Sequence, residues 1–261
     1  MPFVDAFSDA AEQYAAARPA YPKALFEALA SVTPALNTAW DCGTGNGQAA
    51  IGLAALFNTV YATDASVEQI AQAEPHARVQ YRVAPAEASS LANESIDLVS
   101  IAQALHWFEL DSFYAEVHRV TRPNAILAAY GYSWFYLTPA IDELTNRWLL
   151  QPVRTHWSVN NRILWDGYTT IAFPFEEIAA PRLALHLTWT LEQLFEYYLT
   201  WSAPRRKLVA EGDGFVRQAR NAFEPEWGDP TQRRHVVMPL TIRLGRLRPR
   251  TEPWHTLSSG S

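Results

Sequence analysis

The sequence has few of the features that mark disulfide-bonded, membrane-spanning or nucleic-acid-binding proteins. It contains one cysteine, Cys42, so no disulfide can form within the chain. No apolar run approaches the roughly 18 residues of a membrane span, and the first ten residues carry Asp5 and Asp9 without a basic residue, unlike a signal peptide. The formal net charge of −6 argues against nucleic acid as the main partner. These absences predict a cytoplasmic protein with no membrane or nucleic-acid partner.

At 261 residues, the chain is long enough to bury a large core as one α/β domain. Hydrophobic residues make up 49% and charged residues 18%, which is typical of a globular protein and not of a disordered one. Aromatic residues are unusually frequent at 13%, and most of the ten tryptophans lie beyond residue 130. Such rings either fill a core or line an aromatic-walled pocket in the C-terminal half, and composition leaves both interpretations open.

The most informative stretch is residues 38–64, which contain a strand ending at Asp41, a glycine-rich loop, a helix and a second strand ending at Asp64. A short apolar strand is expected to end at Asp41, glycines follow at every second position, and residues 49–56 have helix-forming composition. A second strand follows and closes with Asp64. Alternating glycines let a ligand approach bare backbone amides ahead of a helix N-terminus. Asp64 is expected beside the same loop, where its carboxylate can accept from two ribose hydroxyls, so the unit predicts a nucleoside site.

Two kinds of nucleoside site fit this loop. Residues 45–50 read G-N-G-Q-A-A, which matches the dinucleotide fingerprint G-x-G-x-x-G/A, and an acidic residue follows about 20 positions on. Counted from Asp41, the segment Asp-x-Gly-x-Gly-x-Gly instead resembles motif I of the class I S-adenosylmethionine (SAM) dependent methyltransferases. In that resemblance Asp41 braces the loop, while Gly43, Gly45 and Gly47 admit the amino-acid part of the cofactor. The loop by itself leaves both alternatives open.

Two further segments carry the methyltransferase resemblance. Tyr14 and residues 18–22 (Arg-Pro-Ala-Tyr-Pro) are similar to the opening of a group that includes the trans-aconitate and farnesoate methyltransferase-like proteins. Residues 103–108 (Gln-Ala-Leu-His-Trp-Phe) are similar to the peptide that follows the fourth strand in that group. The resemblance implies that Tyr14 and Arg18 hold the methionine carboxylate and that His106 is the candidate base. Taken alone, His106 is equally well a buried histidine with satisfied hydrogen bonds.

The resemblance implies a full set of site residues. The cofactor-binding set is Tyr14, Arg18, Asp41, Gly43, Gly45, Gly47, Asp64, Ala65, Ala86, Glu87 and Gln103. The candidate walls of the acceptor pocket are Trp107, Trp134, Trp157 and Trp201. The sequence departs from the family at Pro85, where an acidic residue is commoner, so Glu87 or the backbone near Ala86 must contact the adenine; Glu87 is otherwise a helix-start charge. No metal-ligand set is apparent, and methyl transfer from a sulfonium requires none.

Strand-like and helix-like segments alternate through the first half of the chain. Five such strands, the last of them at residues 125–132, predict a doubly wound parallel α/β sheet. The resemblance extends this to a Rossmann-like, seven-stranded sheet with helical cap insertions. The expected organisation is a single methyltransferase domain at 1–250, with an N-terminal helical lid at 1–32, a SAM-binding core at 38–132, substrate-cap insertions at 134–180 and 191–230, final strands at 182–189 and 236–244, and a tail at 251–261. Asp111 is expected to cap the helix before the fifth strand.

The resulting hypothesis is a SAM-dependent methyltransferase that acts on a small molecule, most simply on a carboxylate or hydroxyl oxygen. No second mononucleotide-binding half follows the fifth strand, which weakens the dinucleotide alternative. Two alternatives remain from the sequence. One is an NAD-dependent oxidoreductase, and the other is a protein that binds SAM without catalysis.

Overall fold

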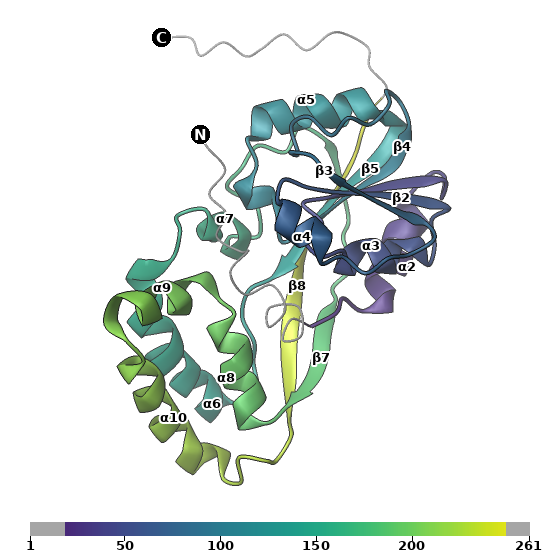
Figure 1. Cartoon of the computed structure of the whole chain (residues 1–261). Helices are drawn as coiled ribbons and strands as arrows, with labels where there is room; N and C mark the ends of the chain where they lie inside the picture. The colour runs from purple at the N-terminus through teal and green to yellow at the C-terminus, as the bar shows by residue number, and fades with distance from the viewer. Residues whose placement is uncertain (1–18, 249–261) are drawn as a thin grey trace.

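A computed structural model of the protein describes residues 19–248, and its centre is one mixed β-sheet (Figure 1). The strand order is β3-β2-β1-β4-β5-β8-β6, and β7 also pairs with β8. The strands are β1 (Thr38–Cys42), β2 (Thr59–Asp64), β3 (Val79–Val83), β4 (Ile96–Ala102), β5 (Thr121–Tyr132), β6 (Glu176–Ile178), β7 (Ala184–Trp189) and β8 (Arg234–Arg246). The first five strands pair in parallel, whereas β8 runs antiparallel to its three neighbours.

Helices cover both faces of the parallel part of the sheet. The flanking elements are α2 (Lys23–Val32), α3 (Gln48–Ala54), α4 (Val67–Ala71), the short 3₁₀ helix η2 (Leu105–Trp107) and α5 (Leu110–Val120). The fourth strand is buried along Ile96 to Ile101, as expected for a central strand of such a sheet. Alternate side chains of one strand therefore enter different cores: Val99 packs on the α5 side with Phe113, and Leu98 packs on the α2 and α3 side with Leu53.

A second group of helices packs beside β7 and the adjoining part of β8 (Figure 1). These elements are α6 (Pro139–Leu144), the π-helix η3 (Thr145–Leu150), the 3₁₀ helix η4 (Gln151–His156), α8 (Leu191–Leu199), α9 (Ser202–Glu211) and α10 (Gly214–Trp227). The short helix α7 (Asn161–Trp165) lies apart from them, next to η2, and its Leu164 belongs to the core on the α5 side. Large buried rings such as Phe195, Phe223 and Trp227 form a core of their own there with Met238 of β8. The high aromatic content of the C-terminal half is thus partly explained by packing.

The structure departs from the sequence-based expectations at several boundaries. The sheet has an eighth strand, the three-residue β6, so residues 176–178 belong to the sheet edge and not to a cap that extends to residue 180. Residues 23–32 form α2, whose Leu25 and Leu29 are fully buried against the sheet; this part of the expected lid belongs to the core. The helix before β5 begins at Leu110 with Glu109 as its N-cap, and the expected cap Asp111 lies in the first turn instead.

Within residues 19–248, no helix is both long and apolar enough to cross a membrane.

Candidate functional site

The glycine loop joins the end of β1 to the start of α3. Gly43, Gly45 and Gly47 all have positive φ, at 69°, 56° and 90°, a region that residues with a Cβ rarely adopt. A Cβ at Gly43 would lie 2.6 Å from the Cβ of Ala104, so the loop is packed tightly against the residues that follow β4. Among residues 19–248, a Cβ at Gly45 would meet only Oε1 of Gln69, at 3.6 Å, so no other described residue crowds the loop there.

Asp64 lies directly beside this loop. One oxygen of its carboxylate, Oδ2, accepts from the backbone N–H of Gly45 at 2.8 Å, and the other, Oδ1, accepts from the N–H of Ser66 at 2.9 Å. The parallel pairing of β1 with β2 brings the two strand ends together, with Cys42 opposite Thr63. Since a carboxylate offers about four acceptor positions, Asp64 can hold the loop and still accept from a ligand.

Asp41 lies underneath the loop and is fully buried. Its Oδ2 accepts from the hydroxyl of Thr44 at 2.6 Å, and its Oδ1 accepts from Ser100 at 3.1 Å; the Ser100 hydroxyl is in turn 2.8 Å from that of Tyr130. Burial raises the pKa of Asp41 to about 6, although the hydrogen bonds from Thr44 and Ser100 oppose the shift. Through its hydrogen bond with Thr44, this carboxyl group supports the loop from below.

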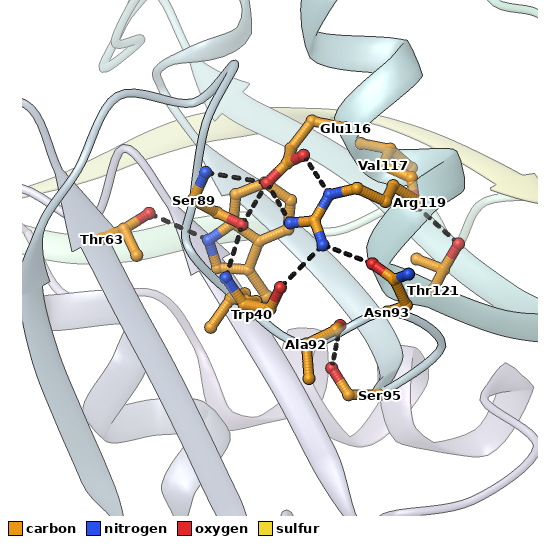
Figure 2. A network of polar contacts seen from close by, with 11 residues as sticks. Trp40, Thr63, Ser89, Ala92, Asn93, Ser95, Glu116, Val117, Arg119 and Thr121 are labelled. Carbon is orange, nitrogen blue, oxygen red and sulfur yellow. Dashed lines mark hydrogen bonds and ion pairs between the residues drawn. The ribbon is translucent and has the colours of Figure 1, made fainter.

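The loop after β3 is held by a polar network on the α5 side (Figure 2). Oε1 of Glu116 accepts from both the backbone N–H and the hydroxyl of Ser89, at 2.8 and 2.5 Å, and Arg119 binds both oxygens of the same carboxylate. Burial opposes the ionisation of Glu116, but the hydrogen bonds from Arg119 and Ser89 outweigh it and lower its pKa. The network fixes the segment that carries Ala86 and Glu87.

The adenine candidates differ in their surroundings. Ala86 is buried, while Glu87 is half-buried and accepts from the backbone N–H of Glu109 at 2.9 Å. The Glu87 carboxylate thus has a structural partner at the start of α5, and Ala65 is half-buried next to Asp64. Tyr14 and Arg18 lie outside the described residues.

Gln103 and His106 follow the end of β4. The side-chain amide of Gln103 donates to the carbonyl oxygen of Tyr132 at 2.8 Å, which ties the end of β4 to the end of β5. His106 lies in η2 and is almost fully buried. Its ring is 4.9 Å from that of Trp107 and 6.4 Å from that of Tyr168, centroid to centroid. His106 therefore lies at the carboxyl edge of the sheet between two aromatic side chains.

Three of the four predicted wall tryptophans come together. Trp134, Trp157 and Trp201 are mutual neighbours, with ring centroids 5.7 to 6.1 Å apart. Trp165 completes the cluster at 5.1 Å from Trp134 and 5.2 Å from Trp157. Trp107 instead contacts the His106 ring. We call Trp134, Trp157, Trp165 and Trp201 the tryptophan cluster.

A hollow of about 150 Å³ lies beside the cluster and is lined by Trp134, Trp165 and Thr241, among others. Sequence reasoning did not single out Trp165 or Tyr168. Both lie in an irregular stretch with little periodicity, so only their aromatic character marked them.

Comparison with known proteins identifies the family. The methyltransferase domain family matches residues 40–129. A Dictyostelium discoideum protein named as a methyltransferase is 30% identical over 204 residues, which is 77% of this chain and 78% of that protein. The chain belongs to the methyltransferase family. A solved structure named for a type II methyltransferase of Anaeromyxobacter dehalogenans is 40% identical and has a TM-score of 0.84, covering 89% of this chain and 99% of the other.

A third relative of this methyltransferase is more distant. It is a Saccharomyces cerevisiae protein whose name describes an S-adenosylmethionine-dependent methyltransferase, 28% identical over 131 residues, with 47% of this chain and 44% of that protein covered. The family match spans β1 to most of β5 and includes the glycine loop, Asp64 and His106. It ends before Trp134, so the tryptophan cluster lies outside it. Membership in this family removes the oxidoreductase alternative.

Proposed function

We propose that this methyltransferase binds S-adenosylmethionine at the glycine loop and transfers its methyl group to an oxygen of a small-molecule acceptor. The arrangement of Gly45 and Asp64 carries the proposal: backbone that the described residues leave uncrowded faces a carboxylate from the neighbouring strand. A carboxylate in this place suits the two ribose hydroxyls of a nucleoside. The name of the S. cerevisiae relative supports the choice of cofactor.

Different residues would contact different parts of the cofactor. Gly43, Gly45 and Gly47 would lie against its amino-acid part, Asp64 would accept from the ribose, and residues 86–87 would face the adenine. Tyr14 and Arg18, Ala65 and Gln103 complete the proposed set. When bound, SAM supplies an electrophilic methyl group on a sulfonium. The chain's own contribution is to align the acceptor with that methyl group and to exclude water.

His106 and the tryptophan cluster support the acceptor side of the proposal. An acceptor hydroxyl would give its proton to the imidazole of His106, whereas an acceptor carboxylate needs no base. The hollow beside Trp134 and Trp165 has about the volume at which a cavity accommodates one aromatic ring. We therefore assign residues 134–175 and 191–230 to the segments that cover the bound acceptor. Trp107 would lie beside His106, the candidate base.

Calorimetric titration with SAM tests the cofactor site. Wild type should bind SAM and S-adenosylhomocysteine but not NAD. Asp64→Asn should weaken SAM binding about 10- to 100-fold, because charge-assisted hydrogen bonds to the ribose are lost. The control is Asp111→Asn, which changes an exposed carboxylate on α5 and should bind like wild type. Equal affinity in the two variants would overturn the assignment of Asp64.

An acceptor screen with methyl-labelled SAM tests catalysis. Carboxylic acids and alcohols with aromatic or extended apolar bodies should yield labelled product and S-adenosylhomocysteine. A protein that binds SAM tightly yet forms no S-adenosylhomocysteine with any acceptor would be a SAM-binding protein without catalysis.

A further inference from the structure

Tyr168 combines a rare backbone conformation with a buried phenol. Its φ is +60°, and it follows Gly167, whose φ is +68°. Non-glycine residues in this region are strained, and such strain concentrates at functional sites. The backbone is held in place from both sides: the N–H of Tyr168 donates to the carbonyl oxygen of Ile163 at 2.8 Å, and a guanidinium nitrogen of Arg243 donates to its carbonyl oxygen.

The hydroxyl of Tyr168 has no hydrogen-bond partner among the described residues, although the side chain is fully buried. A buried polar group without a partner costs free energy, so native proteins rarely keep one without a use. Burial also raises the pKa of Tyr168 above its ordinary value, which keeps the phenol protonated and able to donate. Another fully buried tyrosine, Tyr198, shows the ordinary case: its hydroxyl donates to the carbonyl oxygen of Leu149 at 3.0 Å.

The turn that carries Tyr168 is close both to the hollow and to His106. On one side, Trp165 lines the hollow, and a Cβ at Gly167 would be 3.7 Å from Thr241, which lines it too. On the other side, the Tyr168 ring is 6.4 Å from the His106 ring. One short segment, residues 165–168, therefore contributes both a wall of the hollow and a phenol whose ring is close to the candidate base.

We propose that the Tyr168 hydroxyl donates a hydrogen bond to the oxygen-bearing head group of the methyl acceptor, and that this acceptor is a small aromatic acid or alcohol whose ring occupies the hollow at Trp134 and Trp165. The inference rests on the proposed function and names its substrate class. Tyr168 acts in binding and orientation: no bond to it forms or breaks, and its proton stays on the phenol. Because the ring is covered, the acceptor must part η2 from the α7 turn; both elements are short, so this opening breaks few contacts.

The first test compares Tyr168→Phe with Tyr198→Phe in thermal melts. Both changes remove only a hydroxyl, and the strained backbone at residue 168 is unchanged. Tyr198→Phe should lower the melting temperature because it removes a hydrogen bond, whereas Tyr168→Phe should leave it unchanged or raise it. An equal loss in both variants would show that the Tyr168 hydroxyl already has a partner, and the proposal would fail.

The second test measures binding of benzoate, indole-3-acetate and p-cresol to protein saturated with S-adenosylhomocysteine. At least one probe should bind wild type, and Tyr168→Phe should weaken that binding about 10- to 100-fold, as for loss of one buried hydrogen bond to a ligand. Tyr198→Phe should stay within twofold of wild type. For a probe that is methylated, Tyr168→Phe should raise KM with little change in kcat, since the bond is present before and during transfer.

The outcomes separate this proposal from the one on which it rests. Unchanged binding in Tyr168→Phe, or binding of no probe to a wild type that does bind SAM, overturns the role of Tyr168 and the aromatic acceptor. A wild type that binds neither SAM nor S-adenosylhomocysteine overturns the proposed function itself.

Discussion

Two alanine substitutions in the glycine loop separate backbone strain from steric conflict. Gly43 and Gly45 have similar positive φ values of 69° and 56°, so alanine is strained at either position. Their surroundings differ. A Cβ at Gly43 would lie 2.6 Å from the Cβ of Ala104 and 3.1 Å from the ring of Phe108, whereas the one described residue that a Cβ at Gly45 would meet is Gln69, at 3.6 Å. Comparing the two variants isolates the cost of the contact with Ala104.

The expected magnitudes follow from these contacts. The left-handed conformation costs alanine about 1–2 kcal/mol, which is the whole expected loss for Gly45→Ala. Gly43→Ala adds an overpacking cost of about 1–3 kcal/mol, because the methyl group of Ala104 moves only with the backbone between β4 and η2. We therefore expect Gly43→Ala to lower the free energy of unfolding by about 2–5 kcal/mol.

Urea denaturation followed by tryptophan fluorescence measures both losses. Ala104→Gly removes the opposing methyl group, so a double-mutant cycle with Gly43→Ala should show a favourable coupling of about 1–3 kcal/mol. Gly45→Ala should weaken SAM binding at least tenfold despite its smaller effect on stability, since its methyl group would fill the open space beside the loop. Equal losses in the two single variants, or a coupling near zero, would refute the steric argument.

Three further predictions concern the carboxylates and the base. When the pH falls from 8 to 5, the unfolding free energy of wild type should rise by about 1.5 kcal/mol relative to that of Asp41→Asn. The reason is that a pKa raised to about 6 makes the folded state favour the protonated acid. Denaturant melts in which the stability of wild type instead rises with pH, relative to Asp41→Asn, would contradict this. Glu116→Ala should cost about 2–4 kcal/mol in the same melts, since it leaves the Ser89 and Arg119 donors without their acceptor. The matched control is Glu192→Ala, which removes an exposed ion pair with Arg220 and should lower the free energy of unfolding by less than about 1 kcal/mol. Similar losses of stability in the two variants would mean that burial of the Glu116 carboxylate is unimportant. His106→Ala should lower kcat on a hydroxyl acceptor about 100-fold or more with unchanged SAM affinity; full turnover would exclude His106 as the base.

The parts of the fold that were predicted correctly are those fixed by local sequence. The strand β2 closes with Asp64, the helix α3 covers most of residues 49–56, and β5 includes residues 125–132, as the sequence predicted. Each of these features depends on interactions within a few residues.

The errors lie where distant segments decided the outcome. The strand β6 has only three residues and exists because it pairs with residues 244–246 of β8, whose other edge pairs with β5. No local pattern indicates this pairing. The helix α9 also has a weak local signal, because it is polar along most of its length and packs chiefly on η4. Asp111 was the expected N-cap of α5, but that position is occupied by Glu109, whose side chain accepts from the N–H of Ser112.

The sequence alone determined the glycine loop, the spacing to Asp64 and the parallel sheet that brings the two together, because these follow from backbone freedom and from the apolar periodicity of adjacent segments. Only the tertiary structure decided which tryptophans cluster, that Tyr168 lies beside His106, and that the hydroxyl of Tyr168 is buried without a partner among the described residues. Two of those relations, Trp134 with Trp201 and His106 with Tyr168, join residues more than 60 positions apart, and an irregular stretch lies between them. No short-range preference constrains the packing of large rings there, and it is settled only when the whole core is assembled.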